Sequence, residues 1–412
     1  MGSGVLGSLT RHVDQSARWC AVAIGFSLPI SVAADSILLV LVVLGFALGG
    51  AYRHKWRILR DNPIALSALA LYAMLLIGSL YGNAAPGDRE SYLVKYSDLL
   101  AIPLLLYFFR EPAVRRYGIG AFAASLVLIL LWSTLFKAGV IPKLPFTRGD
   151  DVFPVVFKLK LTHNVLMAFA GFLFTCLAIG AGTKALRLMW TALAVLAIIN
   201  VMLLIPGATG YLITAALALY LAYGWARWRG ITVAVFSVTL LFAVLTIVPG
   251  AFQERMLQMS REVSALTGGP APHDSSLGLR LNYYRLTLAI IRDHPLTGVG
   301  TGGFPKAYRE KAQKAGPVEV RNPHNEYLLM TAQNGVIGLL LLLHLFWRHW
   351  RLAPQLATPL ETRLARGLLL TIMLGCLFNS FLLDHTEGLL YAWMTGLLFA
   401  GYNSPVTRRL SN

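Results

Sequence analysis

The sequence predicts an all-α polytopic membrane protein with about twelve transmembrane helices. Hydrophobic residues make up 56% of its 412 residues and charged residues only 13%, whereas a soluble domain carries about 25% charged residues. The apolar residues stand in blocks close to the roughly 20 residues that a helix needs to cross a bilayer. Backbone groups in lipid must find their partners within the segment, and no alternating strand pattern is visible, so each block is expected to be a helix.

Twelve apolar blocks follow one another along the chain, and we expect each to span the membrane. They divide it into residues 1–249 with nine spans, a large periplasmic loop at 250–325 with two or more helices, and residues 326–412 with three spans and a cytoplasmic C-terminus. The blocks cover residues 18–34, 36–51, 63–81, 93–109, 118–137, 163–181, 188–206, 208–224, 231–249, 326–347, 367–383 and 388–403.

The charge distribution predicts the orientation of these spans. The chain has a net charge of +17, and short loops with many Arg and Lys residues and few acids alternate with loops of another kind. By the positive-inside rule the Arg-rich loops and both termini lie in the cytoplasm. The opposite loops, 82–92, 138–162 and 250–325, hold further basic residues that topology does not require. This excess favours an anionic substrate or contact with lipid headgroups.

The segment 250–325 is too long to be a structureless connection. Residues 277–293 have helical periodicity behind a Ser275-Ser276 cap, and 305–315 form a second, short amphipathic helix. The glycine-rich run 298–304 between them is predicted to be a flexible, tight turn. It is not read as a nucleotide-binding loop, because no strand precedes it. The Gly-Pro-rich residues 268–272 are expected to be a hinge or disordered.

A polar cluster, Arg321-Asn322-Pro323-His324-Asn325-Glu326, stands where this segment meets the tenth apolar block. Ionisable groups at a membrane boundary are costly and are usually kept for function. Asn322 is predicted to cap the helix and Pro323 to be its first residue. The positive end of a helix favours phosphate and a neutral imidazole, which suits His324 as a general base. The alternative is a histidine that only caps the helix at headgroup level.

Basic side chains of the outer loops are the candidates for binding an anion, because a guanidinium fork matches a phosphate. For each of them the alternative is a solvated surface or a headgroup contact. The main candidates are Arg280, Lys95, Arg148 and Arg285, and the further basic ones are Arg321, Arg89, Lys158 and Lys160. Asn325, beside His324, and His163, which starts the sixth block in a similar His-Asn pair, are possible further site residues.

Neither a metal nor a cofactor is predicted. The sequence Asp384-His385-x-Glu387 places three potential ligands within four residues, but at the start of a span this pattern is more typical of a polar cap. The three cysteines lie far apart inside apolar runs and show no metal-binding spacing.

A longer pattern gives the cluster a family context. It runs from Arg280 through Pro295-Leu296-x-Gly298-x-Gly300-x-Gly302-x-Phe304 and His324-Asn325-x-Tyr327-Leu328 to Gly335-x-Ile337-Gly338. This pattern, with about twelve spans and one large loop late in the chain, resembles the O-antigen ligase and O-antigen polymerase superfamily. On this resemblance Arg280 and His324 are the family's loop arginine and loop histidine. Family members often carry an arginine where this sequence has Ala208, so that position is vacant here.

The resemblance implies a GT-C-like glycosyltransferase of the bacterial inner membrane, active on the periplasmic side. Its donor would be a glycan on undecaprenyl pyrophosphate, and its acceptor a sugar hydroxyl of lipid A–core oligosaccharide. It would work with inversion, without a metal and without a nucleotide sugar. The implied partners are therefore these two substrates and the membrane lipids, and no nucleic acid.

Three other functions fit the sequence. An O-antigen polymerase shares the donor and the loop pattern, and a protein O-oligosaccharyltransferase belongs to the same superfamily. A transporter of an anion or a lipid-linked glycan would use the same basic residues without forming a glycosidic bond.

Overall fold

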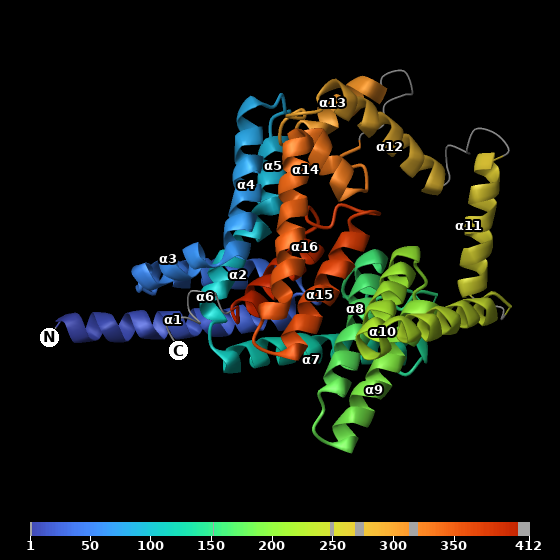
Figure 1. Cartoon of the computed structure of the whole chain (residues 1–412), viewed down its shortest axis with the longest axis horizontal. Helices are drawn as coiled ribbons and strands as arrows, with labels where there is room; N and C mark the ends of the chain where they lie inside the picture. The colour runs from blue at the N-terminus through green and yellow to red at the C-terminus, as the bar shows by residue number, and fades with distance from the viewer. Residues whose placement is uncertain (1, 151, 248–250, 268–275, 313–319, 403–412) are drawn as a thin grey trace.

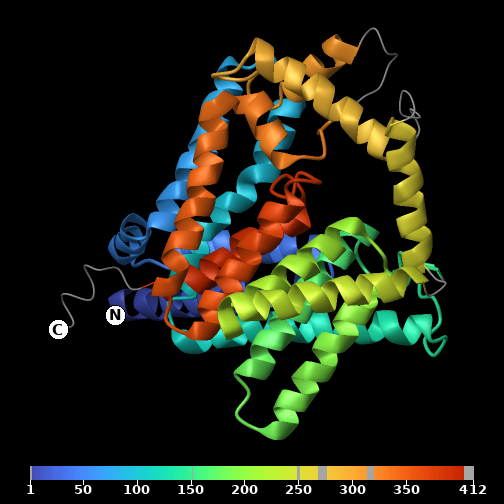
Figure 2. The ribbon, with the colours of Figure 1, turned by 45° about the vertical axis from the view of Figure 1, so that its right-hand side comes forward.

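The computed structural model describes residues 2–150, 152–247, 251–267, 276–312 and 320–402. Over these residues every regular element is a helix, as predicted (Figure 1). The predicted hinge at 268–272 lies outside the described residues. Elements α12 and α13 lie at the top of Figures 1 and 2, and the turn between α8 and α9 lies at the bottom.

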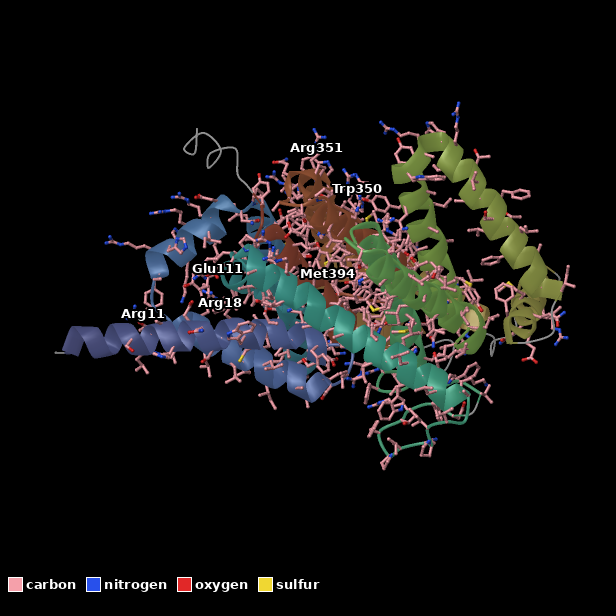
Figure 3. All side chains as sticks on the ribbon, turned by 90° about the horizontal axis from the view of Figure 1, so that it is seen from below. Arg11, Arg18, Glu111, Trp350, Arg351 and Met394 are labelled. Carbon is pink, nitrogen blue, oxygen red and sulfur yellow. The ribbon has the colours of Figure 1, made fainter. Side chains whose placement is uncertain are left out.

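The first third of the chain forms a layer of crossing helices. Helices α1 and α2 pair as a hairpin, α7 packs against α1, and Arg18 Nη1 donates to Glu111 Oε1 at 2.7 Å to join α1 to the start of α7 (Figure 3). The elements are α1 (Gly2–Ser27), α2 (Val32–Leu48), α3 (Tyr52–Asp61), α4 (Pro63–Tyr81), α5 (Asp88–Tyr96), η1 (Ser97–Leu100), α6 (Ala101–Phe108) and α7 (Pro112–Lys137).

The middle of the chain contains α8 (Lys160–Ile179), α9 (Lys184–Ile199) with η2 (Asn200–Leu204), and α10 (Ala208–Ile247). Helix α10 turns back on itself at Ala226 and Arg227, whose backbone angles are not helical. The Tyr211 and Phe242 rings, at opposite ends of α10, consequently lie 6.0 Å apart. The turn falls between the two blocks predicted at 208–224 and 231–249.

The long loop segment contributes three helices: α11 (Ala251–Thr267), α12 (Ser276–Asp293) and α13 (Phe304–Ala312). Helix α12 agrees with the predicted 277–293. The described part of the predicted 305–315 helix is α13. Helix α12 runs across the top of the molecule from α13 towards α11 (Figure 2).

The glycine run between α12 and α13 is docked rather than flexible. Gly298, Gly300 and Gly302 all have positive φ. This backbone conformation is readily available only to glycine. Gly300 N donates to Gln333 O of α14 at 2.8 Å, and Thr301 N donates to Gly78 O of α4 at 3.1 Å. The run therefore holds α12 and α13 against two apolar helices.

The last part of the chain contains α14 (Glu326–Leu352), η3 (Ala353–Gln355), α15 (Pro359–Gly375) and α16 (His385–Phe399). The predicted span at 367–383 is wrong in its second half, because α15 ends at Gly375. Phe381 packs so closely there that a Cβ on Gly375 would lie 1.8 Å from its ring. Residues 376–384, called here the C-terminal turn, form turns between α15 and α16.

Among the described residues, seven helical segments are long and apolar enough to cross a membrane, or eight if the bent pair α2–α3 counts as one. The chain is thus a multi-pass membrane protein, but the predicted number of about twelve spans is not confirmed. Helices α15 and α16 have only 17 and 15 residues. The GT-C-like arrangement and the three-part division of the chain stay predictions.

Candidate functional site

His324 lies just before α14 in a strained backbone conformation. Its φ is 53°, which costs a non-glycine residue about 1–3 kcal/mol and is most often kept at functional sites. The side chain of Asn322 accepts a hydrogen bond from His324 N at 2.9 Å and so closes a tight turn. The prediction that Asn322 caps the helix is therefore wrong. The cap is Asn325, whose side chain accepts from Leu328 N at 3.0 Å, and α14 begins at Glu326 rather than at Pro323.

The imidazole of His324 ends a chain of polar side chains. His324 Nδ1 lies 2.9 Å from Asn379 Oδ1, and Asn379 Nδ2 donates to Asp384 Oδ2 at 2.6 Å. Burial raises the pKa of the Asp384 carboxyl, and the charges of Lys95 and His324 oppose that rise. Lys95 and His324 thus lie close enough to Asp384 to act on its carboxyl.

Glu326 holds the C-terminal turn beneath His324. Its side chain is fully buried. One carboxylate oxygen accepts from the Tyr96 hydroxyl at 2.6 Å, and the other from Leu382 N at 3.1 Å. Asn325 Nδ2 also donates to Leu377 O at 3.1 Å. The start of α14 therefore positions the turn that carries Asn379.

Helix α12 covers this cluster and brings Arg280 towards it. The Tyr284 hydroxyl donates to His324 O at 3.4 Å and to Leu377 O at 3.0 Å. The Tyr283 and His324 rings lie 5.9 Å apart. Arg280 precedes Tyr284 by four residues and so lies on the same face of α12, about 6 Å along the axis.

Arg280 also lines a cavity of about 480 Å³ together with Ala208, Lys160, Asn164 and Glu254. The position where the resemblance leads us to expect an arginine thus lies in the same cavity as the loop arginine. Ala208 is exposed. Lys160 supplies a positive charge to this cavity, with its Nζ 3.4 Å from the centre of the Phe153 ring.

A second basic cavity, of about 770 Å³, contains Arg148, Lys158 and Thr386. The loop folds back on itself here, because Arg148 N donates to Val156 O at 2.9 Å. Lys158 is buried, and its Nζ donates to Thr386 Oγ1 at 3.1 Å. Burial lowers the pKa of Lys158, while Asp35 and Glu387 oppose that change. Thr386 is two residues from Asp384, so this cavity adjoins the His324 cluster.

Three helices begin around this region: α8 after Lys158, α14 after Asn325, and α16 after Asp384. Helix N-termini carry partial positive charge and free N–H groups, which favour anions. Lys95 acts on the Asp384 carboxyl, Arg148 lines the cavity with Thr386, and Arg280 lies one turn of α12 before Tyr284, so the region can bind a multiply charged anion beside a histidine.

The other predicted residues lie outside the hydrogen-bonded cluster of His324, Asn379 and Asp384. His163 is buried on α8, with its Nε2 3.3 Å from Asn200 Oδ1. Arg285 is exposed and donates to Asn282 Oδ1 at 3.4 Å, and Arg89 donates to Gly82 O at 3.2 Å. Arg321 is exposed, and its carbonyl oxygen accepts from the Tyr92 hydroxyl.

Three polar residues of the cluster were not predicted as site residues: Asn379, Asp384 and Glu326. Asp384 was singled out only as part of a weak metal pattern. A signal for all three was present, since each is a polar residue inside or beside an apolar block. Among the described residues, no group of three or more His, Cys, Asp or Glu side chains has the geometry to hold a metal.

Comparison with known protein families finds a match over part of the chain. Residues 193–343 match the family model described as O-antigen ligase. The matched stretch includes Ala208, Arg280 and His324 but ends before Asn379 and Asp384. No curated protein matches the sequence.

Proposed function

The chain belongs to the O-antigen ligase superfamily of glycosyltransferase-like membrane enzymes, and on that premise we propose that it is an O-antigen ligase of lipopolysaccharide biosynthesis. It transfers a glycan from undecaprenyl pyrophosphate to a sugar hydroxyl of lipid A–core oligosaccharide. The reaction takes place on the periplasmic side of the inner membrane, with inversion and without a metal. The observation that carries this proposal is the strained His324, hydrogen-bonded to Asn379 beside Lys95 and Asp384.

The hydrogen bonds favour one nitrogen of His324 as the base. Asn379 Nδ2 donates to the Asp384 carboxylate, so Asn379 Oδ1 is the atom that faces His324 and it can only accept. His324 Nδ1 therefore carries the proton, and Nε2 keeps its lone pair. A base held in this way can take the proton of an attacking sugar hydroxyl, which contributes about 10²–10⁴-fold to the rate.

In the proposed transfer step one bond forms and one bond breaks. The acceptor oxygen forms a bond to the anomeric carbon of the donor sugar while its proton passes to His324 Nε2. The bond from that carbon to the diphosphate breaks, and the diphosphate leaves with the electron pair. Arg280, Lys95 and Arg148 provide fixed positive charge where negative charge develops on the leaving group, which stabilises the transition state.

The test is transfer in vitro with purified protein, lipid A–core and an undecaprenyl pyrophosphate glycan. His324→Ala should lower the rate of transfer by about 10²–10⁴-fold, because the base is lost. The affinity for the donor should stay within about twofold of the wild-type value. The matched control is His344→Ala, an exposed histidine further along α14, which should transfer at the normal rate.

Normal transfer by His324→Ala would remove this histidine from the reaction. Transfer onto a second undecaprenyl-linked glycan, with none onto lipid A–core, would identify a polymerase. A glycosylated protein product would identify an O-oligosaccharyltransferase, and movement of the donor across vesicles without a new glycosidic bond would identify a transporter.

A further inference from the structure

A third basic cavity lies at the end of the molecule away from His324. It has a volume of about 760 Å³ and lies where α10 turns back on itself. Three arginines line it, Arg227 of α10 with Arg363 and Arg366 of α15, together with Tyr220 and Trp225. No acidic residue is among its lining residues.

The cavity is separate from the candidate functional site, because it uses the opposite ends of the same helices. Ile179, the last residue of α8, lines this third cavity. Lys158, two residues before α8 begins, lines the second cavity, the one that contains Thr386. Arg363 and Arg366 stand in the first half of α15, whereas the C-terminal turn follows its last residue. Figure 3 views the side opposite α13, and Trp350, the neighbour of Arg366, lies in this view.

Two of the three guanidinium groups, those of Arg366 and Arg227, contact aromatic side chains. Arg366 lies over the Trp350 ring at 4.9 Å, and its Nε is buried without a hydrogen-bond partner in the described part of the chain. Arg227 Nη1 donates to the Tyr223 hydroxyl at 3.3 Å. Among the described residues, no carboxylate lies within ion-pair distance of these arginines. The Glu361 carboxylate, at the start of α15, is bound to Arg115 at 2.7 Å.

The surroundings of the cavity fit the headgroup level of a bilayer. Trp225 and Trp228 are 82% and 72% exposed. Exposed tryptophans in a membrane protein are typical of the interface between lipid and water, where the ring contacts acyl chains and the indole N–H contacts headgroups. Basic residues at the same level attract anionic lipids.

We propose that this cavity binds the phosphodiester headgroup of an anionic phospholipid, with the guanidinium groups of Arg227, Arg363 and Arg366 contacting the phosphate oxygens. The acyl chains would lie along the exposed apolar surface near Ile179 and Trp225. A planar guanidinium suits this ligand because it can donate two parallel hydrogen bonds to a phosphate. Such a lipid would stabilise the turn in α10, where Arg227 has a φ of 53°.

The experiment is native mass spectrometry of the full-length protein in detergent, mixed with phosphatidylglycerol or with zwitterionic phosphatidylethanolamine. The wild type should retain phosphatidylglycerol preferentially. The double variant Arg363→Gln, Arg366→Gln should retain it about 25-fold less, since each basic residue near a membrane surface contributes about fivefold. The matched control is Lys184→Gln, Arg187→Gln. It removes two exposed charges from the α8–α9 end without touching the cavity, so its retention should be normal.

Equal retention of phosphatidylglycerol by the double variant and the control would overturn the proposal. Displacement of the lipid by inorganic phosphate at millimolar concentration would also overturn it, because it would indicate a site for a small anion. If the double variant does not fold, Arg227→Gln alone carries the same expectation of reduced retention. Because the site is separate from His324, His324→Ala should bind the lipid normally whatever its transfer activity.

Discussion

At the scale of single residues, the candidate site depends on side chains that hold His324 rather than on His324 alone. Three hydrogen-bonding contacts stabilise its left-handed backbone conformation. They come from Asn322 in its own turn, Tyr284 of α12 and Asn379 of the C-terminal turn. A polar cluster at a membrane boundary predicted His324 as a site residue. Its partners come from segments that are 40 and 55 residues away, and local pattern carries no information about such contacts.

Asn379→Ala tests the orientation of the imidazole. The variant leaves His324 Nδ1 without its acceptor, so both tautomers become available and the base is less often presented correctly. We expect kcat for transfer to fall by roughly 10–100-fold, a part of the contribution of the base, with little change in KM for the donor.

Steady-state kinetics with both substrates measure the changes in kcat and in KM separately. A Leu377→Ala variant, which alters an exposed side chain of the same turn, is the control and should keep its kcat. An unchanged kcat in Asn379→Ala would show that His324 needs no help from Asn379.

At the scale of elements, the glycine run 298–304 determines where α12 and α13 lie. The sequence predicted a turn here but not its docking, because the backbone partners at Gly78 and Gln333 belong to distant helices. Helical periodicity was sufficient to predict α12, because that pattern repeats within the segment itself. The apolar pattern was insufficient to predict where α15 ends. The apolar run continues through residues 376–383, but there the chain turns, Phe381 packs against Gly375, and Leu382 N donates to the Glu326 carboxylate.

Gly300→Ala should detach this run. A Cβ on Gly300 would lie 2.2 Å from Gly82 Cα, so one backbone must move. We expect a loss of about 1–3 kcal/mol beyond the strain of the positive φ itself, together with reduced transfer, because α12 carries both Arg280 and Tyr284.

Thermal unfolding in detergent, followed by a transfer assay, measures both effects. Gly139→Ala isolates the strain, since Gly139 also has a positive φ but no atom within 4 Å of its added Cβ. Equal midpoints for the two variants would mean that the docked run contributes nothing beyond its own conformation.

At the scale of the whole molecule, basic residues gather in two places for two reasons. The Arg-rich connections, such as that between α8 and α9, are expected from the predicted topology. The basic residues proposed to act with His324 could not be grouped from sequence alone, because Lys95, Arg148 and Arg280 come from three separate segments. The family match confirms the resemblance on which Arg280 and His324 were paired.

The proposed orientation can be tested with single cysteines in a Cys20→Ser background, since Cys176 and Cys376 are buried. Glu310→Cys on α13 should react with a membrane-impermeant maleimide in intact spheroplasts. Lys184→Cys, at the opposite end of the molecule (Figure 1), should react only after the membrane is permeabilised, as a mass shift on a gel would report. Labelling of both positions in intact spheroplasts would contradict the assigned sides.

The buried Glu326 has a consequence for how the enzyme is made. A ribosome that has completed residue 343 has synthesised the whole family-matched stretch, including Arg280 and His324. At that stage neither Asn379 nor Leu382 exists, so the His324 imidazole lacks its Asn379 partner and the Glu326 carboxylate lacks the hydrogen bond from Leu382 N. The candidate site is therefore incomplete until the C-terminal turn has been made and has packed against the start of α14.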